Sequence, residues 1–535
     1  MPTTVSLIAE RLRGAGCRHA FGIPGGEVLA MMAALADHGI RFTLCKHENA
    51  GGFMAEGAHH ATGAPAILLA TLGPGLANAV NTIANAWQDQ VPLIVLSGAV
   101  DAAEAATYTH QVFDHGALIA PVAKGSFTVA DGAVAAIVDK AIALSLADPP
   151  GPVHIDVPIT LAGAEQPVSD HPPTARPAPA APAPGPELDR ARARLAEAER
   201  PILVAGVGVL HHDASGQIRA VVKRFAMPLV TTYKAKGVLP EDHPLSLGGH
   251  GLSPLSDGLV LPLLAQADLV LAVGYDPIEM RAGWRQPWAP GKAIELSHIP
   301  NRHGMHGAGL SFVGHVGRGL EAVTAGVARR PAVWPGGEPA KARAALAEAF
   351  ADRPAWGPHA AFAAARRASP AETVVTADSG AHRILLSQMW QTPAPRHLVQ
   401  STALCTMGCA LPLAIGHKLA RPETPVLAVM GDAGLEMVLG ELATLRDLAL
   451  PVAVLVLVDR SLALIELKQR GAGLANLGVD FGATDFVAVA GALGGVGVAV
   501  AGAASLEAAL AEAYARDRFT LIACEIGPKA YDGAF

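Results

Sequence analysis

The stretch that decides the fold is PVLAVMGDAG, residues 425–434, in which an apolar run ends at Asp432. A second apolar run, VAVLVLVD at 452–459, ends in the same way at Asp459. Continuous apolar runs of this length are typical of strands buried on both faces of a parallel sheet, and the residues between them, 435–448, have helical spacing. We therefore expect a β-α-β crossover.

The two carboxylates that end these strands indicate a metal site. The carboxyl ends of parallel strands meet at one edge of the sheet, where α/β proteins bind their ligands. Asp432 and Asp459 can therefore share one hard divalent cation. Gly431 and Gly434 allow close backbone approach, and the helix that begins near Leu435 offers unpaired N–H groups to a phosphate. The pattern predicts Mg²⁺ bound to a diphosphate.

The composition describes a large, well-buried globular protein. Hydrophobic residues make up 51% of the 535 positions and charged residues 16%, and a chain of this length usually forms about three domains. The net charge is -7 and there is no long Lys or Arg tract. These features argue against nucleic acid and anionic membranes as partners.

Targeting signals and cysteines favour a reducing, cytoplasmic location. Residues 1–16 are amphipathic and lack a secretory apolar core, so we expect a first helix there. The most apolar long stretch, 487–504, contains a Gly-Gly pair and fits a helix, a turn and a strand better than a membrane span. The five cysteines are scattered, unlike a disulfide framework. Cys405 and Cys409 are four apart, but nothing at ligand spacing completes a zinc site, so we interpret them as core thiols.

Two stretches rich in proline divide the chain. Prolines recur through 166–186 with Ala and Ser, a composition that favours extended polyproline over a packed core. A weaker cluster of Pro and Gly falls at 331–339, before an Ala-rich helix that starts at Ala340. We expect linkers at 166–186 and 331–355, and domains over 1–165, 187–330 and 356–535.

Each of the three segments alternates short apolar runs with helical spacing, as doubly wound α/β domains do. The N-terminal segment has an apolar run at 66–71, a helical stretch at 76–87 and another apolar run at 92–98. The C-terminal segment repeats this order from 407 to 431. The predicted fold class is α/β with three doubly wound parallel-sheet domains, in which the outer two are related and the central one differs.

The central segment contains two apolar runs that end in glycine turns, at 202–208 and 269–274. Such turns accompany nucleotide binding, but they also serve tight packing of a strand on a helix, and we favour packing. His298, His303 and His306 lie in a loop of Pro, Gly and Asn with no strand or helix to fix ligand geometry. We therefore expect a solvated loop rather than a metal site.

Besides the spacing of Asp432 and Asp459, the chain contains the motifs FGIPGG (21–26), HENA (47–50), EG (56–57), TLGPG (71–75), Asn78, DQVP (89–92), TMG (406–408) and LP (411–412). As a set, these motifs resemble those of the thiamine-diphosphate-dependent enzymes of the acetolactate synthase and benzoylformate decarboxylase type. The resemblance spans nearly the whole chain and implies a pyrimidine-binding domain, a central domain that sometimes holds FAD, and a diphosphate-binding domain. Thiamine diphosphate and Mg²⁺ are the implied cofactors.

Glu48 precedes a helical stretch of small residues at 49–62. A Glu at a helix start is often only a cap favoured by the helix dipole, but the resemblance implies catalysis. In the family this carboxyl group binds the aminopyrimidine ring of the cofactor, which then removes the C2 proton of the thiazolium. We expect an apolar setting made by Cys45, Ala50 and Phe53 to raise the pKa of Glu48.

Further cofactor contacts are implied by the same resemblance. Met407 matches the apolar side chain that bends the cofactor into a V, although a core methionine is the alternative. The main-chain carbonyl of Cys405 matches the contact to the 4′-amino group, and His382 matches a phosphate contact. The other matching cofactor-binding positions are Pro24, Gly25, Gly73, Asn78, Gly380, Gly431, Asp432, Ala433 and Gly434.

For the metal, the resemblance implies Asp432, Asp459 and the main-chain oxygen of Ser461 as ligands. The family usually has Asn where this chain has Asp459, and a second Asn where it has Val458. An extra carboxylate beside an anionic diphosphate weakens binding unless a cation or a proton offsets it. The adjacent Arg460 is a candidate for that charge.

On the substrate side, Gln111 matches a glutamine that faces the reaction centre, and His110 replaces the usual Phe beside it. Glu27 replaces a small residue and is either a second acid/base group or a solvated helix-start Glu. Lys468 replaces the family's substrate-selecting Trp. It shares a helix face with Leu464 and either reaches an anionic substrate or extends to solvent.

Arg281 roughly matches an Arg that binds a second substrate's carboxylate, although the alignment needs one inserted residue. The segment 276–281 departs from the motif that accompanies FAD, so we expect FAD to be absent.

The resemblance implies decarboxylation of a 2-oxo acid such as pyruvate, followed by carboligation to a carbonyl acceptor, as in acetolactate synthase. Simple decarboxylation to an aldehyde and acyl transfer to phosphate or coenzyme A stay as alternatives on the same cofactor. A second alternative is an inactive cofactor-binding subunit, which the retention of Glu48 argues against. In this family the active sites lie between subunits, so we expect a homodimer or a homotetramer made of two dimers.

Overall fold

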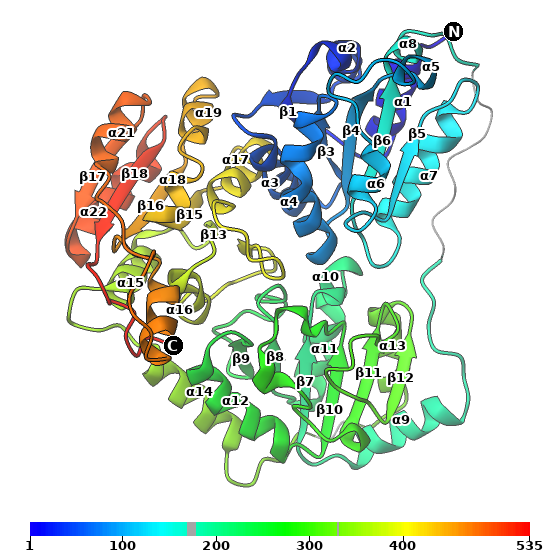
Figure 1. Cartoon of the computed structure of the whole chain (residues 1–535). Helices are drawn as coiled ribbons and strands as arrows, with labels where there is room; N and C mark the ends of the chain where they lie inside the picture. The colour runs from blue at the N-terminus through cyan, green and yellow to red at the C-terminus, as the bar shows by residue number, and fades with distance from the viewer. Residues whose placement is uncertain (168–177, 329–330) are drawn as a thin grey trace.

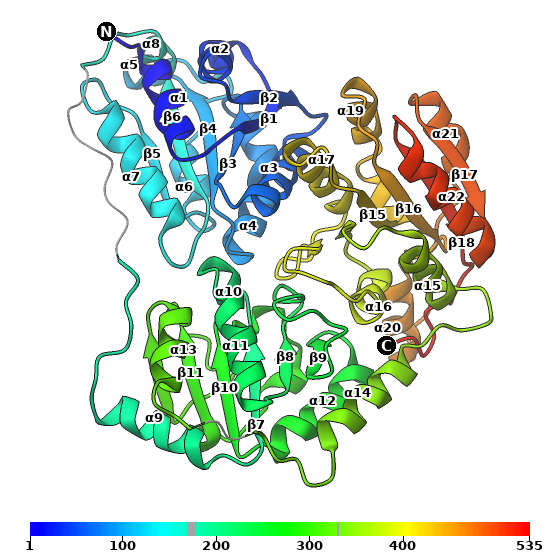
Figure 2. The same cartoon turned by 180° about the vertical axis from the view of Figure 1, so that it is seen from behind.

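The protein, a computed structural model, is described over residues 1–167, 178–328 and 331–535. Within these residues the strands form three six-stranded sheets, and all strand pairs in them are parallel. Figures 1 and 2 show the N-terminal and C-terminal sheets side by side, with the central sheet below them. The predicted α/β class with three doubly wound domains is confirmed.

The N-terminal sheet has the strand order β2-β1-β3-β4-β6-β5. Its strands are β1 (His19–Ile23), β2 (Arg41–Leu44), β3 (Ala66–Ala70), β4 (Leu93–Ala99), β5 (Gly125–Thr128) and β6 (Val153–Pro158). The α-helices of this domain are α1 (Thr4–Gly14), α2 (Leu29–Asp37), α3 (Glu48–Thr62), α4 (Pro74–Gln88), α5 (Ala102–Ala105), α6 (His115–Ile119), α7 (Val134–Leu146) and α8 (Ile159–Ala162), with a 3₁₀ turn, η1 (Gly26–Val28).

The C-terminal sheet has the order β14-β13-β15-β16-β18-β17, which repeats the N-terminal order strand for strand. Its strands are β13 (Val374–Ala377), β14 (Leu398–Gln400), β15 (Val426–Gly431), β16 (Ala453–Val458), β17 (Val496–Val500) and β18 (Thr520–Glu525). Its helices are α15 (Pro358–Ala368), α16 (Ala381–Met389), α17 (Ala410–Ala420), α18 (Asp432–Glu436), α19 (Glu441–Asp447), α20 (Ala463–Gly471), α21 (Phe486–Ala492) and α22 (Ala503–Ala515), and α14 (Glu338–Ala349) precedes them against the central domain. The two outer domains are therefore related, as the sequence predicted.

The central sheet differs from the other two, with the order β12-β11-β10-β7-β8-β9. The strand order reverses between β7 and β10, a topological switch point at which α/β proteins open a crevice. The strands are β7 (Pro201–Ala205), β8 (Leu229–Thr231), β9 (Ser246–Gly249), β10 (Leu269–Val273), β11 (Ala293–Ser297) and β12 (Leu310–Val313). The helices are α9 (Pro186–Glu197), α10 (Gly208–His211), α11 (Ser215–Phe225), α12 (Pro254–Gln266) and α13 (Val316–Thr324), with 3₁₀ turns η2 (Pro277–Glu279), η3 (Ala282–Trp284) and η4 (Pro290–Lys292).

Helices α3 and α17 occupy equivalent places in the two outer domains and pack against each other. Glycines allow their backbones to touch. A β-carbon at Gly57 would lie 2.1 Å from the Leu413 carbonyl oxygen, and one at Gly416 would lie 1.8 Å from that of Met54. The contact places the beginning of α3 beside the C-terminal domain, where the main-chain N–H of Lys46 donates to Glu441 at 2.8 Å.

The structure changes some of the predicted boundaries. The helix expected over 435–448 is two helices, α18 and α19, which turns at 437–440 separate, and Glu441 at the start of α19 accepts from the backbone of Lys46. The segment 331–355 contains α14, which packs on α12. In the expected linker 166–186, Gln166 is buried against the N-terminal domain, Pro186 begins α9, and 168–177 lie outside the described residues.

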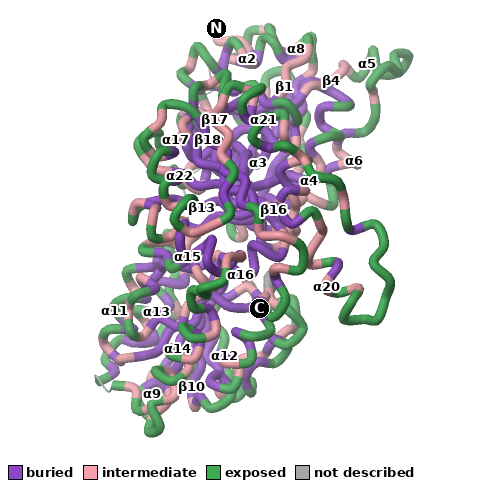
Figure 3. Tube along the Cα trace, turned by 90° about the vertical axis from the view of Figure 1, so that its left-hand side faces the viewer, coloured by how far each residue is buried: buried purple, intermediate pink, exposed green. Residues whose placement is uncertain are grey.

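Burial follows the sheets. Figure 3 shows the strands buried in each domain and exposure concentrated on outer helices and loops. Among the residues that the structure describes, none of the helices is both long and apolar enough to cross a bilayer. The stretch 487–504 forms most of α21, a turn and β17, as predicted.

Candidate active site

The N-terminal half of the site centres on Glu48, the first residue of α3. Its side chain is buried, and Oε2 accepts a 3.0 Å hydrogen bond from Nδ2 of Asn78 in α4. Oε1 faces Gly75, where a β-carbon would lie 3.4 Å away. Within the described part of the chain no donor bonds Oε1, so this oxygen is available to a ligand. A side-chain amide that orients a buried carboxyl group exceeds what a helix cap requires.

The apolar setting expected around Glu48 is present only in part. Cys45 and Ala50 are buried in one cluster beside it. Burial, followed by the Glu441 and Glu48 carboxylates, raises the pKa of the Cys45 thiol. Phe53 was wrongly placed in this setting, because it faces the C-terminal domain instead, in a cluster with Val374, Val399, Cys409 and Leu413.

Glu27 contacts the segment 71–75, which Glu48 also faces. Thr71 Oγ1 donates a 2.6 Å hydrogen bond to Glu27 Oε2. A β-carbon at Gly25, which follows Pro24, would lie 2.2 Å from Thr71 Oγ1, so only glycine fits there. Glu27 is half-buried, and its bond to Thr71 distinguishes it from a solvated residue at a helix start.

Gly73 and Gln111 pack closely against each other at the edge of the Glu48 half of the site. Gly73 has a φ of 66°, and a β-carbon on it would lie 2.5 Å from the carbonyl oxygen of Gln111. Gln111 is exposed and has a positive φ of 60°. His110 beside it is also exposed and contacts the Tyr108 ring edge-on.

A buried chain of hydrogen bonds fixes the position of Gly73 against Gln111. The Gly73 N–H donates to Nε2 of His115 at 3.1 Å, so Nε2 is an acceptor and Nδ1 carries the proton that bonds Asp156 Oδ1 at 2.8 Å. Ser97 also donates to Asp156 Oδ1, at 2.6 Å. Although burial alone would raise the pKa of Asp156, hydrogen bonds from His115, His154 and Ser97 lower it below its usual value. The charged carboxylate therefore fixes the tautomer of His115 and, through it, the turn at Gly73.

The C-terminal half of the site centres on Asp432, at the end of β15. Its Oδ2 accepts the main-chain N–H groups of Asp459 at 3.1 Å and Arg460 at 2.7 Å, and Oδ1 accepts that of Ala433 at 2.9 Å. Asp459 Oδ1 accepts the N–H of Ser461 at 3.2 Å. Strands β15 and β16 are neighbours, so the two carboxylates meet at one edge, as the sequence predicted.

The two carboxylates repel each other. Burial raises the pKa of Asp432, and burial together with the Asp432 charge raises the pKa of Asp459 to about 7. The guanidinium of Arg460 pairs with Glu525 at 3.3 Å. The expectation that Arg460 offsets the Asp459 charge is therefore wrong in this arrangement, since its side chain is directed to the neighbouring strand β18. A divalent cation between oxygen ligands would relieve this repulsion.

Unpaired buried polar atoms lie next to Asp432. His382, at the start of α16, has no partner for Nε2, and Ser379 in the same turn has none for Oγ. A β-carbon on Gly431 would lie 3.3 Å from the His382 ring, and one on Gly380 would lie 2.6 Å from it. Burial, followed by the Arg383 charge, lowers the pKa of His382 to about 3. Polar groups of this kind, lined by glycines, suit an anionic ligand.

Met407 and Cys405 lie in one loop beside this half. Met407 is half-buried, and the N–H groups that follow it, of Gly408 and Cys409, donate to Asp378 at 3.0 and 2.9 Å. Cys405 has a positive φ of 58°, and its sulfur accepts a hydrogen bond from Arg383 at 3.2 Å. These hydrogen bonds fix the shape of the loop.

Family comparisons match the whole architecture. The N-terminal TPP (thiamine pyrophosphate) binding domain of thiamine pyrophosphate enzymes matches residues 2–118, their central domain matches 188–323, and their C-terminal TPP binding domain matches 378–524. A probable 2-ketoarginine decarboxylase of Pseudomonas aeruginosa is 31% identical over 89% of this chain and 86% of its own length. The chain belongs to the thiamine pyrophosphate enzymes.

Other relatives of this TPP enzyme are acetolactate synthases. The large subunit of isozyme 1 from Escherichia coli is 29% identical over 87% of this chain and 83% of its own length. The acetolactate synthase of Bacillus subtilis is 28% identical over 92% of this chain and 88% of its own length. The family has both decarboxylases and synthases among these relatives, and all are similar to this chain across its three domains.

The residues present fit the family's cofactor. The oxygen pair of Asp432 and Asp459 suits a hard metal ion, and the unpaired Ser379 and His382 atoms suit a diphosphate. Gly434 also allows the close approach expected of it, because a β-carbon there would lie 1.9 Å from Asp378 Oδ2.

The substrate-side residues are less closely grouped. Lys468 is exposed on α20, and Leu464, four residues earlier, is half-buried and packs on the core. Arg281 lies in the central domain, where its exposed side chain donates to the Leu252 carbonyl oxygen at 2.9 Å. No contact of these side chains with Glu48 or Asp432 is present among the described residues.

The crevice of the central domain is partly filled by its own side chains. It encloses about 290 Å³ and is lined by Tyr275, Asp276, Glu295 and His298, among others. A β-carbon on Gly208 would lie 2.6 Å from the His298 ring, so this glycine serves packing. His298 and Asp276 both bond Gln90, at 3.1 and 2.6 Å.

The solvated loop expected at His298, His303 and His306 is wrong for two of the three. His298 and His306 are buried, and His306 bonds Glu295 at 2.8 Å. In the described ranges the only three-residue set with metal-ligand spacing is His115, His154 and Asp156. Hydrogen bonds occupy their atoms, those of His154 being to Ser97 and Ser126. The cysteines are free thiols, and four of the five, including Cys409, are buried.

The sequence prediction missed two carboxylates and one histidine. Asp378 follows β13 directly, so the signal used for Asp432 and Asp459 could have found it. Asp156 lies near the end of β6, so the same signal, a carboxylate where an apolar strand ends, applies to it less directly. His115 has no local signal, because its partners Gly73 and Asp156 are distant in sequence.

Substitution of Asp459 tests the metal site. We expect Asp459→Asn to keep or tighten thiamine diphosphate binding, since it removes a charge beside the diphosphate and keeps an oxygen ligand. Asp459→Ala removes the oxygen and should weaken binding roughly tenfold or more. Titration of the cofactor at saturating Mg²⁺ measures both affinities. Weaker binding by the Asn variant than by the Ala variant refutes the assignment.

Substitution of His115 tests the support of Gly73. His115→Asn keeps a donor for Asp156 but removes the acceptor for the Gly73 N–H, so we expect a loss of about 1–3 kcal/mol of stability. His115→Gln is the complementary variant, because its side-chain oxygen reaches as far as Nε2 and restores that acceptor while the donor for Asp156 is lost. Denaturant unfolding compares both variants with the wild type, and a His115→Asn variant that is as stable as the wild type contradicts this role.

Proposed function

We propose that the protein decarboxylates a 2-oxo acid with thiamine diphosphate and Mg²⁺ and transfers the remaining hydroxyalkyl unit to a carbonyl acceptor. The observation that carries the proposal is the buried Glu48–Asn78 pair at one sheet edge, with Asp432 and Asp459 at the equivalent edge of the related sheet. When bound, thiamine diphosphate supplies a carbon nucleophile and an electron sink.

The residues of the chain have distinct roles in this proposal. Glu48 holds a proton against the pyrimidine ring, and Asn78 keeps the Glu48 carboxyl group in place. Asp432, Asp459 and the main-chain oxygen of Ser461 hold Mg²⁺. The other cofactor contacts that we propose are Pro24, Gly25, Gly73, Gly380, His382, Cys405, Met407, Gly431, Ala433 and Gly434.

Exposed Gln111 faces the reaction centre in this proposal, and the half-buried Glu27 supplies a second acid/base group. Their shared turn supports both roles, because Gly73 packs on Gln111 and Thr71 bonds Glu27. His110 and Lys468 are exposed polar groups in place of aromatic ones, which favours a polar or anionic substrate.

Simple decarboxylation is the second candidate. The probable 2-ketoarginine decarboxylase among the relatives favours it. The acetolactate synthases favour carboligation. Both reactions begin with decarboxylation of the 2-oxo acid. They differ in whether the remaining hydroxyalkyl unit is protonated or transferred to a carbonyl acceptor, so product analysis separates them.

We further propose that a second copy of the chain completes each site, as a homodimer or a pair of dimers. Large apolar side chains are exposed near both halves, which supports a covering subunit. Near the Glu48 half these are Leu44, Tyr108 and Phe113, and near the Asp432 half they are Met437, Leu474 and Leu477.

We propose that the reaction proceeds without FAD. The position of His298 supports this, because its side chain lines the crevice of the central domain and is held there by the packing on Gly208 and the bond to Gln90.

Turnover of 2-oxo acids tests the reaction. We expect CO₂ release from at least one acid in a panel that includes pyruvate and 2-ketoarginine, with thiamine diphosphate and Mg²⁺ added and no flavin. Products are compared with and without added aldehydes and phosphate. Glu48→Gln should lower the rate about 10²-fold or more. Cofactor binding without turnover of any acid contradicts the proposal, and a flavin spectrum or a requirement for FAD contradicts its last part.

Mixed subunits test the shared site. A mixture of Glu48→Gln and Asp432→Ala chains should regain up to about a quarter of wild-type activity, because half of the hybrid dimer's sites are intact. The matched control mixes Asp432→Ala with Asp459→Ala, which damage the same half and should regain nothing. No recovery in the first mixture at any ratio counts against a site between subunits.

A further inference from the structure

A small cavity lies where the three domains meet. Its volume is about 40 Å³, enough for about three water molecules, since one buried water needs roughly 10–15 Å³. The titratable side chains that line it come from every domain and are Glu56, His59, His60, Asp89, His211, Lys234 and Arg396.

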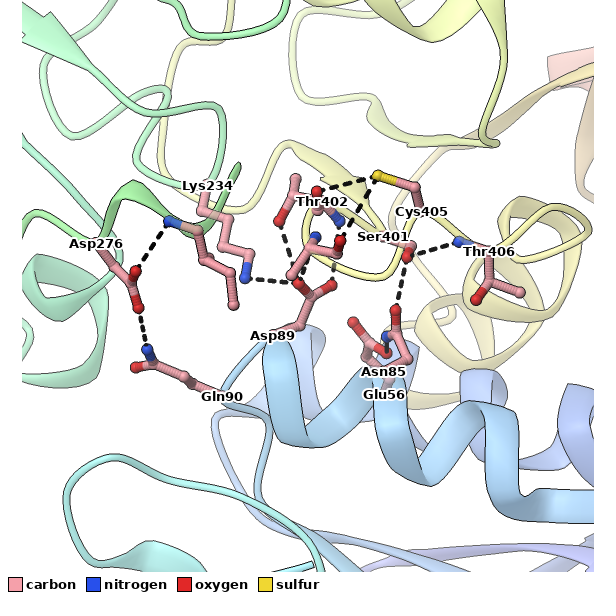
Figure 4. A network of polar contacts seen from close by, with 12 residues as sticks. Glu56, Asn85, Asp89, Gln90, Lys234, Asp276, Ser401, Thr402, Cys405 and Thr406 are labelled. Atoms are coloured by element: carbon pink, nitrogen blue, oxygen red, sulfur yellow. Dashed lines mark hydrogen bonds and ion pairs between the residues drawn. The ribbon is translucent and has the colours of Figure 1, made fainter. Parts of the chain in front are cut away.

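One of the two acids that line the cavity, Asp89, has a cation and several hydrogen-bond donors as partners. Its Oδ1 lies 2.7 Å from Nζ of Lys234. Its carboxylate also accepts the main-chain N–H groups of Thr402 at 3.2 Å and Ala403 at 2.9 Å, and the Thr402 hydroxyl at 3.2 Å. Figure 4 shows these contacts converging on Asp89 from the loop and from Lys234. Asp89 and Lys234 together therefore contribute no net charge to the cavity.

The other acid, Glu56, adds no charge at neutral pH. It is buried, and burial followed by repulsion from Asp89 raises its pKa to about 8. Its Oε2 accepts from Asn85 at 2.8 Å, and its Oε1 lies 3.3 Å from Nε2 of His60. A protonated Glu56 donates to Nε2, which leaves the proton of a neutral His60 on Nδ1.

Arg396 is the charged residue of the cavity for which the described residues provide no partner. Its guanidinium makes no hydrogen bond or ion pair with any residue that the structure describes. Burial lowers its pKa, and only the more distant charge of Asp213 opposes this effect. Since an arginine keeps its proton in proteins, the positive charge stays.

Two histidines present free nitrogens beside Arg396. Nδ1 of His60 and Nδ1 of His211 are buried and have no hydrogen-bond partner. Burial, followed by the charge of Arg396, lowers the pKa of His60 to about 3. Burial, followed by neighbouring His298, lowers the pKa of His211 well below its usual value. With both rings neutral, the cavity has one positive charge in excess.

We propose that this cavity binds a small carboxylate of the size of formate or acetate, with Arg396 as its charge partner and His60 and His211 beside it. A guanidinium pairs with a carboxylate through two parallel hydrogen bonds. The anion neutralises the charge of a half-buried guanidinium for which the described residues provide no partner. The site uses none of the residues proposed for catalysis.

Thermal unfolding of the full chain, with thiamine diphosphate and Mg²⁺ present, tests the site. Sodium chloride is replaced stepwise by sodium formate or acetate at constant ionic strength. A ligand that binds only the folded chain raises Tm in a saturable way, and this is the expected result. A Tm that does not change, or that rises without saturation, overturns the proposal.

Variants separate the cavity from general salt effects. Arg396→Gln should weaken the apparent carboxylate affinity about tenfold or more. Arg285→Gln removes the same charge from an exposed position and should keep the wild-type response. Glu56→Gln, which imitates the protonated acid, should also keep it. A wild-type response in the Arg396 variant overturns the proposal.

A crystal of the wild-type protein provides a measurement that does not depend on a variant that folds. After a soak in acetate, density for a carboxylate against Arg396 is expected. Water alone in the cavity at an acetate concentration that saturates the Tm response overturns the proposal.

Discussion

The arrangement of the three domains depends on one buried carboxylate, that of Asp89. A carboxylate taken out of water is stable only when its partners are all in place. Those of Asp89 come from the central domain, through Lys234, and from the C-terminal domain, through the loop at Thr402. The next residue, Gln90, joins the central domain again through Asp276. Three separate sheets are therefore held in one geometry by polar groups at the end of a single helix, α4.

The strongest features of the fold could be predicted because they are local. Long apolar runs identify buried parallel strands, and Asp432 and Asp459 end neighbouring strands, so their meeting follows from the topology. The helix between them was predicted less well. Gly440 weakens it, and the bond between Lys46 and Glu441 connects residues from different domains, which no local pattern reveals.

The features that could not be predicted depend on contacts between distant parts of the chain. The direction of Phe53 follows from the packing of α3 on α17, and the pairing of Arg460 with Glu525 follows from the neighbouring strand. The burial of His298 follows from Gln90, which belongs to another domain. Sequence motifs predicted the family, which the comparisons confirm, whereas the supporting residues of the candidate site, such as His115, required the structure.

The contact between α3 and α17 has a consequence for how such a chain can diverge. Gly57 and Gly416 bring main-chain atoms together, and buried side chains of both helices, among them Met54 and Ile415, belong to one cluster. Positions of these helices outside the contact can vary without shifting one domain against the other. A single methyl group added at either glycine, in contrast, would push apart two helices that each begin beside a half of the candidate site.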